Sequence, residues 1–96
     1  MTRAACRLGD VTSGHGPYPS RPSNEASPDT FVNGIRAMRK GDQFVIHCVG
    51  ASCHRLGMNR GSGTVFINNK DAIRIGDPVD CGEVMVVGSH DTFIGD

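Results

Sequence analysis

The fold is decided by the stretch Arg36-Ala37-Met38-Arg39-Lys40-Gly41-Asp42, because the chain repeats its pattern twice more. The other copies are Ala4-Ala5-Cys6-Arg7-Leu8-Gly9-Asp10 and Asp71-Ala72-Ile73-Arg74-Ile75-Gly76-Asp77. Each copy has the form x-Ala-x-Arg-x-Gly-Asp. Internal repetition of this kind predicts an architecture built from repeated supersecondary units.

A second block, rich in β-branched and aromatic residues, also occurs three times, at 27–34, 62–69 and 89–96. It precedes two of the x-Ala-x-Arg-x-Gly-Asp copies, so 27–42 and 62–77 are full units that align without a gap. The third unit is split, because its first block ends the sequence and its second block begins it. We therefore predict a pseudo-three-fold ring in which the two chain ends meet, rather than a linear solenoid.

The residue types within the units predict short strands joined by tight turns. Thr-Phe-Val and Val-Phe-Ile favour strands, while Asn33-Gly34 and Asn68-Asn69 are typical of hairpin turns. Segment 16–28 holds four of the five prolines and is expected to be an extended loop over the surface, not a central strand. Glycine accounts for 13 of the 96 residues, and no segment has helical periodicity. We expect one all-β domain over residues 1–96.

Composition excludes several classes of function. Lys and Arg total 10, as do Asp and Glu, so no broad basic face is available for binding nucleic acid. The sequence lacks a long apolar run and a hydrophobic signal core at its start. The four cysteines are therefore expected to be thiols or metal ligands rather than a disulfide framework.

The repeat also predicts a metal site. A ligand-type residue follows each Gly-Asp at nearly the same distance, and the three are His15, His47 and Cys81. In a pseudo-three-fold ring these positions converge near the axis. We choose His54 as the fourth ligand. Three other residues compete for that place: His90, Cys48 and Cys53.

Three histidines and one cysteine suit tetrahedral zinc, with iron as the alternative metal. A closed four-ligand set is structural, whereas a small metalloenzyme needs an open position and a base such as Glu83 or Asp80. Cys6 is expected to be a packing residue. The repeated arginines are expected to bond the neighbouring aspartates of the Gly-Asp turns.

These repeats resemble those of the PAAR-repeat proteins, whose motif is Pro-Ala-Ala-Arg followed by x-Gly-Asp. The match covers 4–10, 36–42 and 71–77, with Ala4, Arg36 and Asp71 at the proline position. Further similar segments are Gly-His-Gly-Pro-Tyr-Pro at 14–19, Gly-Ser-Gly-Thr-Val-Phe at 61–66 and Asp-Cys-Gly at 80–82.

The resemblance implies a conical β-structure with a metal, usually zinc, near its point, held here by His15, His47, His54 and Cys81. It implies a non-enzymatic tip that caps a trimeric β-helical spike, with one cone per three chains, and that transiently meets the target cell envelope. The setting is expected to be the tail of a bacteriophage virion. The alternative is a type VI secretion system, where a cytoplasmic protein is secreted with the spike. An adaptor that carries an effector is the second candidate function.

Overall fold

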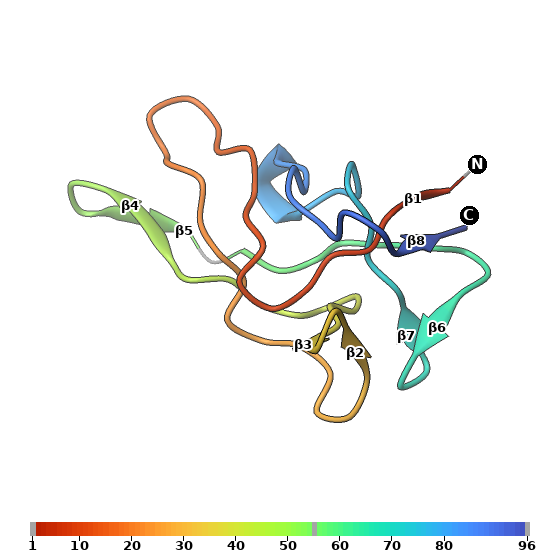
Figure 1. Ribbon diagram of the computed structural model, residues 1–96. Coiled ribbons are helices and arrows are strands. Elements are labelled where there is room, and N and C mark those ends of the chain that lie inside the picture. Colours follow the sequence, from red (N-terminus) through yellow and green to blue (C-terminus); the bar gives the residue numbers. More distant parts are fainter. Residues whose placement is uncertain (1, 55, 96) are drawn as a thin grey trace.

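The structure, a computed structural model, describes residues 2–54 and 56–95, although the side chains of His47, His54 and Cys81 lie outside the described part. Four two-stranded antiparallel hairpins, β1–β8, β2–β3, β4–β5 and β6–β7, account for its strands (Figure 1). The strands are β1 (Arg3–Ala4), β2 (Phe31–Val32), β3 (Ile35–Arg36), β4 (His47–Val49), β5 (Ser52–His54), β6 (Phe66–Ile67), β7 (Lys70–Asp71) and β8 (Phe93–Ile94). A short 3₁₀ turn, η1 (Asp80–Gly82), precedes β8. The all-β expectation is confirmed.

A cycle of three backbone hydrogen bonds relates the three repeats. The N–H of Cys6 donates to the carbonyl of Ile73 at 3.0 Å, Ile73 donates to Met38 at 3.3 Å, and Met38 donates to Cys6 at 3.1 Å. All three side chains are fully buried in the core. The predicted pseudo-three-fold ring is therefore present, and Cys6 is the packing residue that the repeat indicated.

The Arg-x-Gly-Asp part of each repeat forms one recurring turn. In every copy the arginine backbone N–H donates to Oδ2 of the aspartate three residues on, at 2.7 Å. The arginine Nε donates to the same oxygen and Nη2 donates to Oδ1. The glycine between them adopts φ of 88° to 90° in each copy, a region that favours glycine. The pairs are Arg7–Asp10, Arg39–Asp42 and Arg74–Asp77. The expected structural role of these arginines is confirmed.

Three hairpins surround the ring at one end of the molecule. They are β2–β3, β6–β7 and the split hairpin β1–β8, in which Arg3 pairs with Ile94 and Ala4 with Phe93. The chain ends therefore meet as predicted, and the two termini lie side by side in Figure 1. The two intact hairpins turn at Asn33-Gly34 and Asn68-Asn69, where all four residues have positive φ as the sequence indicated.

The middle of the described chain is a closed circuit of six antiparallel segments around 11–13, 21–23, 43–45, 56–58, 78–80 and 83–86. Isolated bridges join each segment to the next, and Thr12↔Met85 closes the circuit. Segment 16–28 contains no strand, as expected, but its residues 21–23 pair with a segment on each side through isolated bridges. Pro22 fits because only its carbonyl is used, accepting from Val45 N–H at 3.1 Å, so its missing N–H costs no ladder bond.

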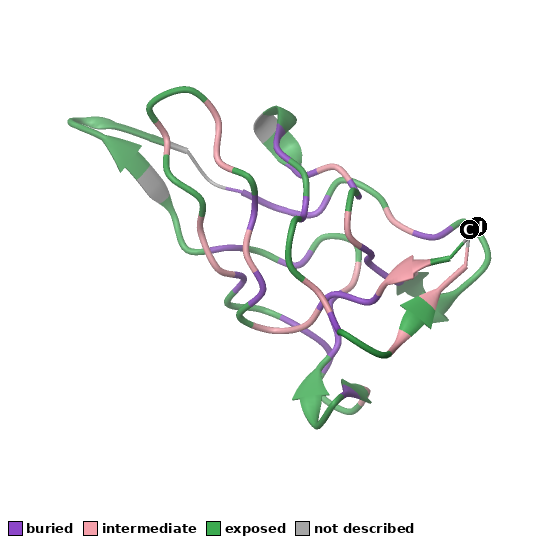
Figure 2. Cartoon of the chain, turned by 45° about the horizontal axis from the view of Figure 1, so that its top comes forward, coloured by how far each residue is buried: buried purple, intermediate pink, exposed green. Residues whose placement is uncertain are grey.

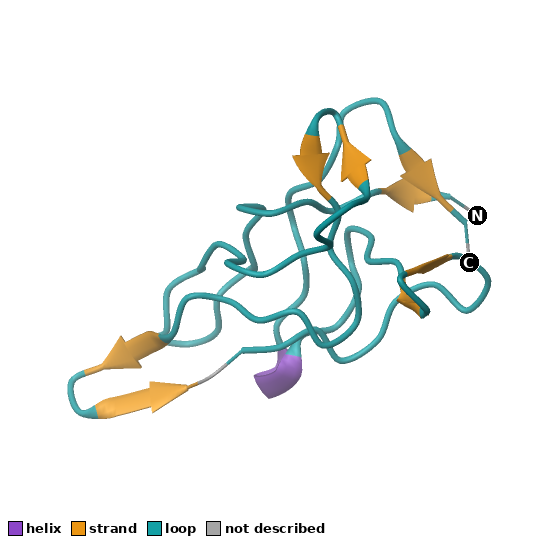
Figure 3. Cartoon of the chain, turned by 90° about the horizontal axis from the view of Figure 1, so that it is seen from below, coloured by secondary structure: helices purple, strands orange, loops and turns teal. Residues whose placement is uncertain are grey.

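The core fills this circuit and the ring of repeats beneath it. Phe44, Leu56, Met58, Val79 and Met85 pack with the three buried residues of the ring. Figure 2 shows the buried backbone in the middle of the molecule and exposed backbone at the outlying hairpins. The molecule is elongated, 38 × 26 × 23 Å, with β4–β5 at the end away from the termini (Figure 3). Among the described residues, no helix has the length and hydropathy needed to span a membrane.

Candidate functional site

The segments that carry the predicted ligands are the turns at one end of the six-segment circuit. His15 begins a turn closed by reciprocal backbone hydrogen bonds with Tyr18, of 3.1 and 2.9 Å. His47 begins β4 and His54 ends β5, and the register pairs these two positions directly. Cys81 lies in η1. Only the His15 side chain is described among these four residues, so the coordination geometry remains a prediction.

Three contacts hold these turns close together. The Tyr18 hydroxyl lies 2.6 Å from the Ser52 hydroxyl, which joins the His15 turn to β5. The Asp80 N–H donates to the Gly57 carbonyl at 2.9 Å, which joins η1 to the segment that follows β5. The Gly14 N–H donates to Glu83 Oε1 at 3.1 Å, which joins the His15 turn to the end of η1. The backbone therefore gathers all four predicted positions at one end.

The structure places Glu83 beside His15, an arrangement that the sequence did not indicate. Its side chain is buried, with 1% of the residue exposed. Oε2 forms a hydrogen bond with His15 Nδ1, while Oε1 accepts from Gly14. The His15 ring also stacks on Tyr18, with centroids 4.9 Å apart. The sequence suggested Glu83 only as the base of a metalloenzyme, because a buried acid near a loop histidine has no signature in spacing.

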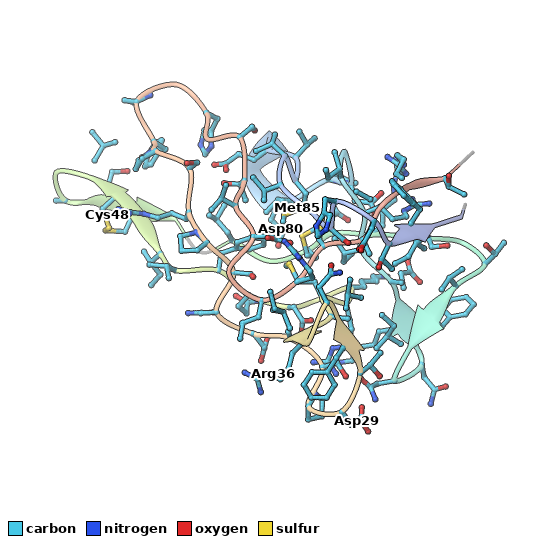
Figure 4. The ribbon with its side chains drawn as sticks, in the orientation of Figure 1. Asp29, Arg36, Cys48, Asp80 and Met85 are labelled. Carbon is cyan, nitrogen blue, oxygen red and sulfur yellow. A yellow bond between two sulfur atoms is a disulfide. The ribbon has the colours of Figure 1, made fainter. Side chains whose placement is uncertain are left out.

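The structure also changes the competition for the fourth ligand. Cys48 and Cys53 form a disulfide across β4–β5, so the expectation of four thiols or metal ligands is wrong for this pair (Figure 4). The reason is local: the hairpin register places the two residues opposite each other, with Cα atoms 4.1 Å apart. The His90 side chain is 83% exposed and lies in the loop that leads to β8, with its Nε2 3.6 Å from Asp91 Oδ2. These placements favour His54 over its three competitors.

Cys6 is the free cysteine among the described residues, and it is buried. Burial raises the pKa of its thiol well above the usual range. The thiol donates to the Val87 carbonyl at 3.4 Å. Among the described side chains, no group of three or more His, Cys, Asp or Glu residues gathers as a metal site.

The opposite end of the molecule presents an apolar surface, which we call the base. Phe31, Phe66 and Phe93 occupy the same position in β2, β6 and β8 and are 56%, 56% and 58% exposed. Ile35 and Val65 add exposed apolar area nearby. Three large rings at equivalent positions around a pseudo-three-fold axis are unusual on a free surface, and such patches mark interaction sites.

Side-chain bonds between neighbouring repeats support the base. Ser89 Oγ donates to Asn33 Oδ1 at 2.6 Å, and Ser27 Oγ donates to Asn68 Oδ1 at 2.7 Å. At the third junction Ser62 Oγ donates to the Gly95 carbonyl at 2.8 Å. The base thus has three similar junctions. In two of them the serine hydroxyl donates to an asparagine side chain, and in the third it donates to a backbone carbonyl.

Comparisons with known proteins agree with these repeats. The PAAR motif family matches residues 8–87. The NAD(P)(+) glycohydrolase toxin Tse6 and the (p)ppApp synthetase toxin Tas1, both of Pseudomonas aeruginosa, are each 37% identical over 78 residues. Double-stranded DNA deaminase toxin A of Burkholderia cenocepacia is 34% identical over 71 residues. Each match covers 70% of this chain, but only 17% of the first two proteins and 5% of the third.

Proposed function

Because this chain belongs to the PAAR motif family, we propose that it is the structural tip of a trimeric β-helical spike. One observation carries this proposal: the three exposed phenylalanines of the base, which lie on hairpins related by the pseudo-three-fold ring. A trimer with closed symmetry presents the same surface three times at its end. One chain with three similar hairpins can meet those three surfaces at once.

The physics of a spike end favours such a cap. A β-helix ends in unpaired backbone groups, and exposed strand edges invite aggregation. Short hairpins around the base can cover those edges, while the three rings bury apolar area against the trimer. Full burial of a phenylalanine side chain contributes about 1.5–3 kcal/mol, and these rings are 56–58% exposed, so each can contribute roughly half of that.

The relatives favour a secretion system over a virion. Their names describe bacterial toxins with three different chemistries, yet all three match this chain over a small part of their length. The shared part therefore does not determine which reaction a relative catalyses. We infer for this chain a place at the tip of a type VI spike, and the virion expectation gains no support. Carriage of an effector on that tip is the second candidate function, favoured by the same relatives.

The metal proposal concerns the other end of the molecule. The three segments that carry the proposed ligand positions are the His15 turn, the β4–β5 hairpin with His47 and His54, and η1 with Cys81, and the contacts described above join them. Strand residues alternate between faces, so we expect positions 47 and 54 on the face opposite the Cys48–Cys53 disulfide. Three imidazoles and a thiolate fit zinc, and a structural zinc site contributes directly to folding free energy. Iron remains the alternative metal. When bound, the metal supplies a cross-link between the turns.

Co-purification tests the spike-tip function. This chain is co-expressed with a trimeric β-helical spike protein from the same genome, and the complex is sized by light scattering. We expect one copy of this chain per spike trimer, and loss of the complex when Phe31, Phe66 and Phe93 are all replaced by serine. The matched control is Val86→Ser, since Val86 is 47% exposed but lies outside the base. Equal binding by the triple variant and the control would refute the docking role of the base.

A further inference from the structure

We propose that Glu83 positions His15 for metal binding, by fixing which ring nitrogen carries the proton and where the ring points. This inference rests on the metal site proposed above. Glu83 is a positioning residue, since it acts through His15 and is not itself offered as a ligand. Its two carboxylate oxygens have separate partners, Gly14 N–H at Oε1 and His15 Nδ1 at Oε2. With both oxygens engaged in a buried site, the carboxylate cannot rotate freely.

The choice of nitrogen follows from the chemistry of the pair. An ionised carboxylate only accepts hydrogen bonds, so the His15 Nδ1 facing it carries the hydrogen. A neutral imidazole has one N–H, which leaves the lone pair on Nε2. Metal-bound histidines commonly donate their other ring N–H to a carboxylate, and this contact fixes the tautomer and makes the ligating nitrogen more basic. Glu83 therefore selects Nε2 of His15 as the ligating atom.

The ring direction is fixed from two further sides. Tyr18 stacks on the His15 ring with an interplanar angle of 24°, and its hydroxyl contacts Ser52 of β5. Gly14 has φ of +74°, and a Cβ there would lie 2.9 Å from the Tyr18 carbonyl oxygen. The turn therefore closes tightly around Gly14, which brings its N–H and the His15 ring to the same carboxylate.

Glu83 also connects two of the proposed ligand segments through its backbone. It follows η1 directly, and its carbonyl accepts from the Val79 N–H at 2.8 Å across that turn. Cys81 lies inside the same turn. One residue thus contacts the His15 ring through its side chain and closes the turn at 80–82 through its main chain, so it joins the two segments.

The test is zinc affinity, measured by competition with a chromogenic chelator on the full chain. Glu83→Gln keeps the size of the side chain but places an NH₂ group against one of the two N–H donors. Loss of an outer carboxylate partner typically weakens metal affinity on the order of 10–100-fold, and we expect a loss in that range. The matched control is Asp80→Asn, an exposed acid in the same turn, for which we expect about fivefold or less.

A double-mutant cycle separates positioning from general support of the fold. If Glu83 acts through His15, Glu83→Gln has little further effect on zinc affinity in a His15→Ala background. An equal loss in both backgrounds would show that Glu83 supports the turn alone, and would overturn the proposal. Histidine ¹⁵N shifts of the zinc-loaded protein supply a direct check, since zinc on Nδ1 of His15 would also overturn it.

The outcomes distinguish this inference from the proposal on which it rests. Wild-type protein that binds no zinc or iron by elemental analysis would remove the metal site and Glu83's role together. Wild-type protein that binds one metal, with Glu83→Gln binding it equally well, would leave the metal site standing and refute only the role of Glu83.

Discussion

The turn formed by Arg39 and Asp42 provides the sharpest test of how the repeats are stabilised. Asp42 is 1% exposed, and it accepts from the Arg39 backbone N–H at 2.7 Å, from Nε at 3.1 Å and from Nη2 at 2.9 Å. The hydrogen bonds that the Arg39 guanidinium donates to Asp42 raise the pKa of the guanidinium, so the arginine stays charged. Asp42→Asn therefore leaves a mostly buried positive charge facing a neutral amide.

The magnitude follows from the burial of the pair. Removing one partner of a buried ion pair costs about 3–5 kcal/mol, and the 11% exposure of the Arg39 side chain places this case near the lower limit. We expect a loss of about 3 kcal/mol in the free energy of unfolding. In a domain of this size that lowers the melting temperature by roughly 12–24 °C.

The assay is urea unfolding followed by circular dichroism, at a fixed excess of zinc so that metal linkage is constant. Asp10→Asn provides a comparison within the same chain, because Asp10 makes the same contacts with the more exposed Arg7. Its expected loss is smaller. Glu25→Gln is the surface control, with an expected change within about 0.5 kcal/mol. If the loss for Asp42→Asn lies within about 1 kcal/mol of that control, which is the contribution of one surface ion pair, the electrostatic account is wrong.

Three further predictions concern other parts of the molecule. Replacing Cys48 and Cys53 by serine removes a link that closes a six-residue loop, and should lower the free energy of urea unfolding by about 2 kcal/mol; reductant should then affect only the wild type. Met38→Ala empties part of the buried core and should cost about 2–5 kcal/mol in the same assay, whereas a loss below about 1 kcal/mol would mean that the ring collapses around the gap. The Asn33 side-chain hydrogen bond lowers the pKa of Asp91, so this contact stabilises the fold above about pH 4 and is lost as pH falls through the lowered pKa. Carboxyl NMR titration of Asp91 should therefore show its midpoint rise toward the ordinary value in Asn33→Ala, and an unchanged midpoint would contradict that cause.

The residues that the sequence predicted well are those whose environment lies within one repeat. The Arg39–Asp42 turn and the turn at Asn33-Gly34 each depend on a few neighbouring residues, so their pattern alone indicates their conformation. The pairing of β1 with β8 was predictable for a related reason. The corresponding strands pair within each complete repeat, so the two parts of the split repeat are expected to pair in the same way.

Other features depended on contacts that no local pattern records. Pro22 enters a paired segment because neither neighbour needs an N–H at that position, which composition cannot reveal. The Cys48–Cys53 disulfide follows from the register of one hairpin, whereas the lack of a signal core in the sequence indicated only free thiols or metal ligands. Glu83 lies 68 residues from His15 in the sequence, so spacing gave no reason to join them.

By itself the sequence determined that this protein is a three-fold repeat of short strands and turns, with its ends joined in one unit and ligand-type residues at matching positions. The tertiary structure decided which residues surround those positions, above all the buried carboxylate of Glu83 beside His15. The physical reason is that repeated local bonds set the conformation of each unit. The residues that surround a site, in contrast, come together only when segments distant in the chain pack against one another and become buried.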